Sequence, residues 1–481
     1  MLDSALVQYA PPTIILSAEW KSQTGIFKKV LQVLQGHHYA KIEYANFTFK
    51  VHDIERDITR IAGEQATSQF GPLTPTVLWT ALSGLLQYHA VLSNVCNFGT
   101  YAMIHRDLTA HMQLDGTAMI ALNLLPPSSG KIENGSVLQV LSRGNTMMGK
   151  RVLERWIRQP LLNKNAIEKR LNVVEFFVQE ASLREELMQD GMRGLPDLDT
   201  LVHKLDVRRS SFTVNDLVRL YDAAKTTIPD IFTTLASNEC NPWYITNSEE
   251  MHTIVDHFTG FIHLVEEVVD MDDRSDLKVN PKHCPELSEM YDTLEQIHLD
   301  VIDEHSRVRR QLGEEARCEK DKVRGFVFRF AKKKEENRIS KLPGYHICQV
   351  LANGVHFTST RLKALGKNYM MTKSMYDKQQ AEILSSATET ASTYVPVIES
   401  ASRLVAELDV LLGFAHAAAH AGEGYVRPQF YDDETIHHVD IRQARHPCLE
   451  LQDHLNFIPN DYTFEETSRL QIITGANMVR T

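Results

Sequence analysis

The stretch from Leu287 to Leu411 limits the possible folds of this chain most strongly, because an apolar residue recurs there at seven-residue intervals. This spacing gives a helix a single apolar seam, and two such seams can pack as an antiparallel pair. We predict a long outward helix and a long return helix, with a kink in the return helix at Pro396. The outward repeat is Leu287, Leu294, Val301 and Val308; the return repeat is Leu362, Tyr369, Tyr376, Ile383, Val397, Leu404 and Leu411, with Thr390 filling its one gap.

Between these two helices the sequence becomes strand-like and strongly basic. Aromatic and β-branched residues alternate in 325–330, and Asn353-Gly354 predicts a hairpin turn within 350–357. Residues 320–341 contain nine Lys or Arg against three acidic residues, in a chain whose net charge is −11. Positive charge at the end of a projecting helical pair is typical of a surface that contacts nucleic acid. The alternative interpretation of these basic residues is a solvated loop without a partner. The candidate DNA-binding residues are Lys320, Lys322, Arg324, Arg329, Lys332, Lys333, Lys334, Arg338 and Lys341.

Composition excludes several classes of protein. An apolar content of 43% and a charged content of 23% are those of a soluble globular protein, and 481 residues suffice for about three domains. No apolar run reaches about 18 residues, so we expect no membrane span, and the N-terminus lacks a secretion signal. Six single cysteines predict neither a zinc site nor a disulfide framework and fit the cytosol or nucleus. The pairs His437-His438 and His416/His420 could contact a metal, but surface or core roles are commoner.

The remainder of the chain reads as helices with smaller α/β parts. Residues 1–110 alternate strand and helix signals, which predicts a small α/β domain beginning with a hairpin of residues 5–9 and 13–16. Further predicted helices cover 27–34, 53–61, 76–92, 114–125, 167–179, 182–189, 215–225 and 251–269, and further predicted strands cover 38–49 and 436–441.

Two short stretches contain more specific sequence patterns, one at residues 146–161 and one near the C-terminus. In residues 146–161 the apolar side chains Leu153, Trp156 and Ile157 share one helical face, arginines crowd another, and Pro160 ends the helix. Taken alone, this pattern indicates a core helix and no function. Near the C-terminus an apolar strand runs into Thr474-Gly475, which is how a phosphate-binding loop begins, but the later glycines and the lysine of such a loop do not follow.

Taken together and in order, these motifs resemble the MutS family of DNA mismatch repair proteins. Residues 146–161 are similar to the core helix motif of the family. Residues 445–447, followed by 457–461, resemble the entry to its ATPase domain, and residues 473–478 resemble the first half of its Walker A loop. Details such as Tyr425-Val426-Arg427-Pro428 are most similar to the eukaryotic homologue-two subunits of the family. The resemblance covers essentially the whole chain.

The resemblance implies a mainly α fold with α/β parts. It comprises a small α/β connector, a helical lever bundle with long antiparallel helices, a β-rich clamp tip and the start of a P-loop ATPase domain. The basic residues of 320–341 then fall in the clamp, which grips the DNA backbone in this family. The implied boundaries are 1–110 for the connector, 111–275 for the helical core, 276–360 for the clamp, 361–422 for the returning lever helix and 423–481 for the beginning of the ATPase domain.

The resemblance also implies partners and cofactors. A MutS homologue six or three subunit would complete a heterodimer that binds duplex DNA with mispairs or small loops in the nucleus, and no membrane is involved. The full-length family is a DNA-dependent ATPase that uses ATP and Mg. The position of Phe457 matches a phenylalanine that stacks on adenine, and the partial ATP site comprises Phe457, Asn460, Thr474, Gly475 and Asn477.

Two departures from the family pattern affect the expected activity. The N-terminal mismatch-binding domain of the family has no counterpart before the connector, and Val479 and Arg480 replace two glycines of the Walker A loop. We therefore expect a fragment that does not hydrolyse ATP and holds no cofactor of its own. The alternative function is a truncated, non-ATPase regulator that competes for partner subunits or for DNA. A purely structural coiled-coil protein is disfavoured by the basic tip.

Overall fold

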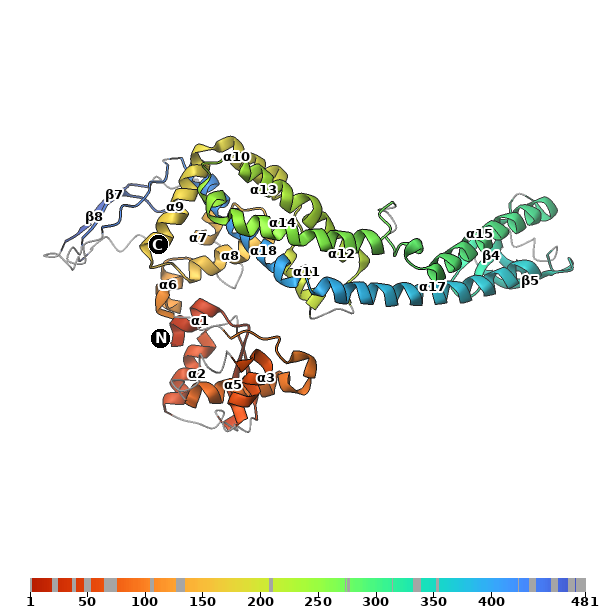
Figure 1. Cartoon of the computed structure of the whole chain (residues 1–481), viewed down its shortest axis with the longest axis horizontal. Coiled ribbons are helices and arrows are strands. Elements are labelled where there is room, and N and C mark those ends of the chain that lie inside the picture. The colour runs from red at the N-terminus through yellow and green to blue at the C-terminus, as the bar shows by residue number, and fades with distance from the viewer. Residues whose placement is uncertain are drawn as a thin grey trace. The chain divides into compact units, whose positions relative to one another are not determined.

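The computed structural model describes residues 2–19, 25–36, 40–46, 53–64, 76–103, 108–126, 135–206, 211–272, 274, 277–313, 315–331, 339–351, 354–422, 424–431, 438–450, 457–465 and 472. The chain forms two compact units, one of Met1–Met188 with Ala406–Thr481 and one of Gln189–Val405 (Figure 1). The described part is mainly helical with small sheets, which confirms the predicted mainly α fold with α/β parts; there are three such sheets among the described residues. None of its helices has both the length and the apolar character required to cross a bilayer. The proposed domain boundaries within it stay predictions.

The N-terminal hairpin prediction is wrong. Residues 5–9 belong to helix α1 (Leu2–Tyr9), and strand β1 (Thr13–Ser17) pairs in parallel with β2 (Lys41–Ala45), not with its sequence neighbour. Helix α2 (Ile26–Gly36) lies between the two strands in sequence, since a parallel pair needs a crossover. Pro11 and Pro12 cannot donate ladder hydrogen bonds, so they separate a helix from a strand more readily than they close a hairpin.

Two predicted helices pack together in the same part of the chain. Helices α3 (Ile54–Ala62) and α5 (Thr76–Tyr88) confirm the predictions for 53–61 and 76–92, although α5 ends four residues early. Its end coincides with Ala90, whose φ of 50° is left-handed and stops the helix. Their contact is an apolar cluster formed by Ile54, Ile58, Ile61, Trp79, Leu86 and Val91.

The predicted helix at 146–161 is α8 (Met147–Arg158), and its N-terminus is held by a buried carboxylate. Thr146 caps the helix by accepting a 2.9 Å hydrogen bond from the N–H of Gly149. Asp409, which is fully buried, accepts hydrogen bonds from the N–H groups of Asn145 and Thr146, both at 2.9 Å, and from the Thr146 hydroxyl at 2.7 Å. A Cβ on Gly149 would lie 2.2 Å from Asp409 Oδ2, so Thr-x-x-Gly is needed for this contact. We call Asp409 with Asn145 and Thr146 the Asp409 site.

The rest of this unit is short helices and one strand pair. The helices are α6 (Gly116–Ala121), α7 (Val137–Leu141), α9 (Lys164–Gln179) and α10 (Ala181–Glu186); α6 is shorter than the predicted 114–125 because Asn123 adopts a positive φ. Strand β7 (Val439–Ala444) pairs antiparallel with β8 (Asn460–Phe464), which confirms the predicted strand 436–441 at residues 439–441; residues 436 and 437 lie outside the described part. Residues 425–428 are anchored on α9, because Arg427 binds Glu175 and Asn172, both at 2.7 Å, and also Glu168.

The second unit is built from long helices. Helices α12 (Val214–Asp222) and α14 (Pro242–Val268) confirm two predictions, although α14 starts nine residues before 251, since Asn241 caps it and Pro242 fits its first turn. Two further helices, α11 (Leu198–Asp206) and α13 (Ile228–Ala236), were not predicted. A π-helical segment, Ala223–Thr227, joins α12 to α13, and another, Leu187–Gly191, follows α10.

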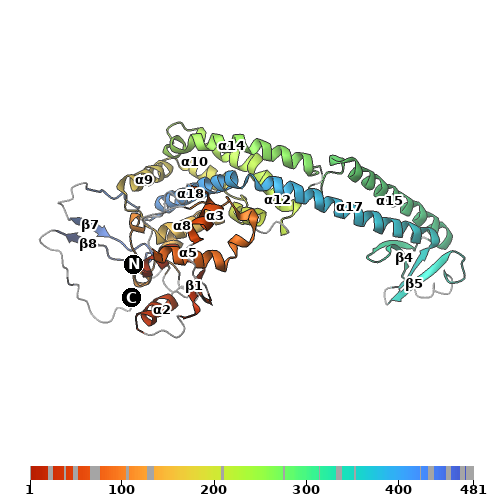
Figure 2. The same ribbon diagram turned by 60° about the horizontal axis from the view of Figure 1, so that its bottom comes forward.

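The seven-residue repeats form the predicted pair of long helices. Helix α15 (Pro285–Leu312) packs against α17 (Thr360–Ser392), and Tyr291 lies near Tyr376 while Asp303 lies near Arg361, so the two run antiparallel (Figures 1 and 2). The kink predicted at Pro396 corresponds to an interruption of the return helix. It falls just before Pro396, at residues 393–394, and α18 (Val395–Ala419) continues with the proline in its first turn. Repeat positions buried in this arm are Leu287, Val301, Val308, Leu362 and Tyr376.

Candidate nucleic-acid interface

The far end of the α15–α17 arm carries a four-stranded antiparallel sheet, which we call the tip sheet (Figure 2). Its strands are β3 (Arg317–Asp321), β4 (Gly325–Phe330), β5 (Tyr345–Leu351) and β6 (Gly354–Ser359), in the order β3-β4-β6-β5. Leu351 pairs with Gly354, so the predicted hairpin of 350–357 is confirmed; Asn353 lies outside the described residues.

The aromatic residues of the tip sheet face its interior. Phe326, Phe328 and Phe330 are at most 3% exposed, and the Phe330 ring stacks on Phe357 with centroids 5.4 Å apart. The cluster includes residues from the ends of both long helices, among them Val308, Leu312 and Leu362. Burial of these rings anchors the sheet on the helices, and it leaves none of them free to stack on a nucleic-acid base.

A buried glutamate ties the two helices together beneath the sheet. Glu304 of α15 is fully buried, and its Oε1 accepts a 2.6 Å hydrogen bond from the hydroxyl of Ser359, the residue that caps α17. Arg307 lies 3.2 Å from the same oxygen. On the outside, Arg361 of α17 lies 3.6 Å from Asp300 and 3.3 Å from Asp303, so the arm is joined by polar contacts as well as by its apolar seam.

The turn between β3 and β4 is fixed by Asp321. Its carboxylate accepts hydrogen bonds from the N–H groups of Arg324 at 2.7 Å and Val323 at 2.9 Å, and these bonds lower the pKa of Asp321. The turn rests on α17 through two glycines. A Cβ on Gly366 would lie 2.2 Å from the carbonyl oxygen of Arg324, and Gly325 has a φ of 77°, which favours glycine. The turn therefore presents Lys322 to solvent from a defined backbone position.

The candidate DNA-binding side chains differ in solvent exposure and in whether a carboxylate already pairs with them. Lys320, Lys322 and Lys341 are exposed and form no ion pair with any described residue. Arg324 is exposed and lies 3.8 Å from Asp321. Arg329 is only 17% exposed and binds Glu319 at 2.6 Å, so its charge is compensated within the sheet. Four candidates lie outside the described residues: Lys332, Lys333, Lys334 and Arg338.

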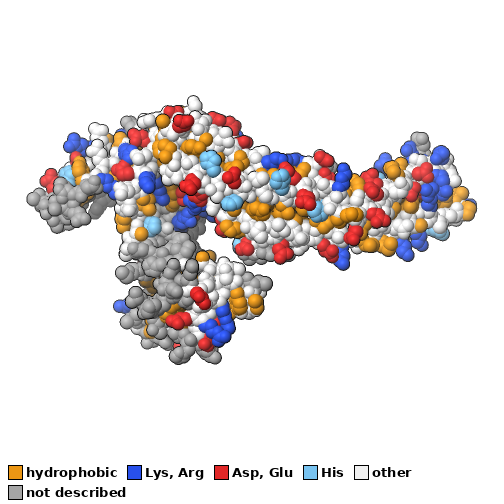
Figure 3. Space-filling model, viewed as in Figure 1, with side chains coloured by type: hydrophobic (Ala, Val, Ile, Leu, Met, Phe, Trp, Pro, Cys, Tyr) orange, Lys and Arg blue, Asp and Glu red, His pale blue; other side chains and the backbone are white. Residues whose placement is uncertain are grey.

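Three further arginines extend the basic surface beyond the predicted stretch. Arg309 and Arg310 are exposed in the last turn of α15, and Arg317 is exposed at the start of β3. Figure 3 shows Lys and Arg side chains gathered at this end of the arm. The run Arg307-Val308-Arg309-Arg310 is a signal of this basic surface in the sequence, although Val308 itself belongs to the heptad repeat.

Of the candidate ATP residues, two are described and they lie close together in the chain. Phe457 is half-buried, and Asn460 begins β8 and donates a 3.2 Å hydrogen bond to the carbonyl oxygen of Ile458. Thr474, Gly475 and Asn477 lie outside the described residues. That the five residues form one ATP site stays a prediction.

Comparison with known proteins identifies the family of this chain. A family model described as MutS domain III matches residues 117–415. The chain belongs to the MutS family, as its motifs suggested.

Within the family it is Msh2-like. It is 31% identical to DNA mismatch repair protein msh-2 of Neurospora crassa, over 94% of this chain and 49% of that protein. It is 30% identical to DNA mismatch repair protein MSH2 of Arabidopsis thaliana, over 99% of this chain and 52% of that protein. The MSH2 protein of Saccharomyces cerevisiae is 26% identical, over 94% of this chain and 50% of that protein. The chain thus spans about half the length of these relatives.

Proposed function

We propose that this chain acts in DNA mismatch repair and that its tip sheet holds the backbone of duplex DNA. The relatives named above are DNA mismatch repair proteins, which gives the process. The observation that supports the contact is the set of exposed lysines, Lys320, Lys322 and Lys341, that no described carboxylate neutralises. Such cations bind phosphates and release the condensed counterions of DNA, a favourable and salt-dependent process.

The tip is suited to holding DNA rather than to reading its sequence. Its aromatic rings are buried in the sheet's own core, so they cannot act as a wedge between base pairs. Phosphate contacts fix position but carry no sequence information. We therefore propose that the tip binds matched and mispaired duplexes equally, and that mispair selection is supplied by another part of the complex.

The remaining parts of the proposal concern partners and nucleotide. The chain works in the nucleus, in a heterodimer with a MutS homologue six or three subunit, on DNA with mispairs or small loops. The full-length family uses ATP with Mg, and in such proteins the segment containing Phe457 and Asn460 forms part of the nucleotide site, where the Phe457 ring stacks on adenine and residues 474–477 contribute phosphate contacts. Stacking of this kind contributes on the order of 1–3 kcal/mol.

A charge-reversal experiment tests the DNA contact. In the triple variant Lys320→Glu, Lys322→Glu and Lys341→Glu, we expect weaker binding to a matched duplex and to one with a G·T mispair, by the same factor. The slope of log K against log salt should fall by roughly 0.9 per lost contact, so by up to about 2.7. Fluorescence anisotropy of the purified chain, alone and with its partner, at several salt concentrations measures both quantities.

A matched control separates a local contact from a general charge effect. Reversing Lys282, Arg193 and Arg219, which are exposed elsewhere in the same unit and form no ion pair with any described residue, changes the net charge equally but should leave the salt slope nearly unchanged. An unchanged slope in the tip variant, or an equal fall in the control, would remove these lysines from the DNA interface.

A further inference from the structure

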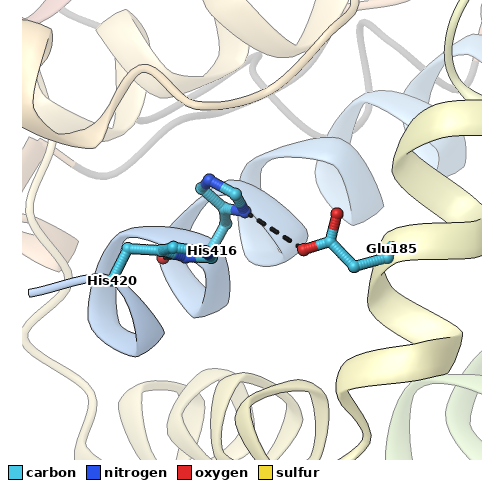
Figure 4. A group of neighbouring side chains, drawn as sticks. All are labelled: Glu185, His416 and His420. Atoms are coloured by element: carbon cyan, nitrogen blue, oxygen red, sulfur yellow. Dashed lines mark hydrogen bonds and ion pairs between the residues drawn. The ribbon is translucent and has the colours of Figure 1, made fainter.

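A cluster of three metal-ligating side chains lies at the C-terminal end of α18, apart from the tip. His416 and His420 are one helical turn apart, and Glu185 reaches toward His416 from α10 (Figure 4). Each offers a ligand atom, and these atoms all lie within 4.8 Å of one another. His416 Nδ1 is 3.6 Å from Glu185 Oε1, and the two imidazole rings are stacked with centroids 4.0 Å apart.

The hydrogen bonds around the rings leave nitrogen lone pairs available. His420 Nδ1 lies 2.9 Å from the backbone carbonyl oxygen of His416, which can only accept, so this nitrogen carries the proton and Nε2 carries the lone pair. Such a bond to the far ring nitrogen is how metal-ligating histidines are usually oriented. His416 Nδ1 is buried and has no hydrogen-bond partner among the described residues, although it faces a carboxylate.

The protonation state of His416 also suits a ligand. Burial lowers the pKa of His416, and the neighbouring His420 and the guanidinium groups of Arg184 and Arg143 lower it further, against the opposing effect of Glu185. Two stacked imidazoles beside a carboxylate supply two nitrogens and one oxygen, the donor set of three-ligand zinc sites. The two arginines oppose a cation, so the affinity depends on the anionic charge of Glu185.

We propose that Glu185, His416 and His420 form a binding site for a divalent transition metal of the zinc type, with water as the fourth ligand. Bond lengths of about 2.0–2.2 Å place tetrahedral ligands about 3.3 Å apart, so the three groups must close slightly around the ion. The partly exposed Glu185 and the exposed His420 can make that adjustment by side-chain rotation. The bound ion would tie the end of α18 to α10.

Metal titration of the full chain, purified without a histidine tag, tests this site. We expect calorimetry to show one equivalent of Zn²⁺ bound per chain, and Co²⁺ to give the visible absorption of a four-coordinate site. His420→Ala and Glu185→Gln should each weaken Zn²⁺ binding by more than about tenfold.

His252→Ala is the matched control. His252 is likewise exposed on a helix, with Nδ1 2.6 Å from the carbonyl oxygen of Ser248, but it has no second histidine and carboxylate grouped with it among the described residues. Its replacement should leave Zn²⁺ affinity unchanged. The absence of a saturable site in the wild-type chain, or equal affinity of wild type and His420→Ala, would overturn the proposal. Because His420 and Glu185 are at the surface, their variants should fold, and circular dichroism would verify this.

Discussion

The Asp409 site and the tip sheet use charge in opposite ways. Asp409 is fully buried, and its carboxylate accepts three hydrogen bonds from Asn145 and Thr146. At the tip sheet the charged side chains are exposed instead: Lys320 and Lys322 face solvent, and the interior is formed by aromatic residues such as Phe328 and Phe357. A charge in the first region is part of the fold, whereas a charge in the second is available for a partner.

The energetic consequence follows from solvation. Removing a buried acceptor leaves its donors unsatisfied at a cost of about 1–3 kcal/mol each, whereas changing a fully solvated side chain alters the stability by about 0.5 kcal/mol or less. Substitutions at the Asp409 site should therefore act on folding, and substitutions of exposed lysines at the tip should act on DNA binding alone.

Asp409→Ala should have the largest effect. It leaves the N–H groups of Asn145 and Thr146 and the Thr146 hydroxyl without their acceptor, so we expect the free energy of unfolding to fall by about 3–5 kcal/mol. Urea unfolding followed by circular dichroism measures the loss. Asp377→Ala, which removes an exposed carboxylate paired with Lys373 on α17, serves as the control and should cost less than about 1 kcal/mol. A loss of similar size for both variants would contradict the structural role of Asp409.

Gly366→Ala should damage the tip without changing any charge. The added Cβ would lie 2.2 Å from the carbonyl oxygen of Arg324, so the β3–β4 turn must move off α17. Overpacking of this kind costs about 1–3 kcal/mol, and DNA binding should weaken because Lys322 is displaced. Gly422→Ala is the control, because a Cβ there meets nothing within 4 Å. If Gly366→Ala binds DNA as the wild type does, the position of this turn is not important for the contact.

The pH dependence of stability should separate Asp409 from ordinary carboxylates. Burial raises the pKa of Asp409, against the hydrogen bonds from Thr146 and Asn145, which lower it. Because the pKa of Asp409 is higher in the folded state than in the unfolded state, the folded state binds this proton more tightly. The group therefore adds to the free energy of unfolding as the pH falls from 7, through that raised pKa, to about 4. Over this range the wild type should gain stability relative to Asp409→Asn, which cannot titrate. The urea midpoints of both proteins at pH 7 and pH 5 test this expectation. If the wild type loses stability relative to Asp409→Asn at pH 5, the pKa of Asp409 is not raised by folding.

Lys322→Glu should have the smallest effect on folding. The side chain is exposed and makes no ion pair with any described residue, so the free energy of unfolding should change by less than about 0.5 kcal/mol. The salt slope of DNA binding should nevertheless fall by roughly 0.9. Arg329→Ala gives the converse test, because Arg329 is already paired with Glu319 and its loss should leave that slope unchanged. A fall in stability of more than 1 kcal/mol for Lys322→Glu would remove the contrast between the two regions.

Several features of this protein were predictable from sequence because they depend on near neighbours in the chain. The heptad spacing from Leu287 to Val308 identified α15, since helical periodicity repeats within a few residues. Pro396 identified the interruption between α17 and α18, because proline lacks the N–H that the helix requires. The concentration of lysines near Lys320 was equally visible, since composition does not depend on the fold.

Other features were decided only by tertiary structure, because they join residues that are distant in sequence. The parallel partner of β1 lies across a crossover, so the local signal at residues 5–16 gave an incorrect hairpin. Asp409 meets Thr146 across 263 positions, and the reason for glycine at position 149 was therefore hidden. The pairing of β3 with β4 determined which cations stay exposed. It brings Arg329 next to Glu319, which neutralises its charge, whereas Lys322 lies in the turn between the two strands and faces solvent. The sequence alone determined where the positive charge is concentrated, and the fold decided which of those charges are available to bind DNA.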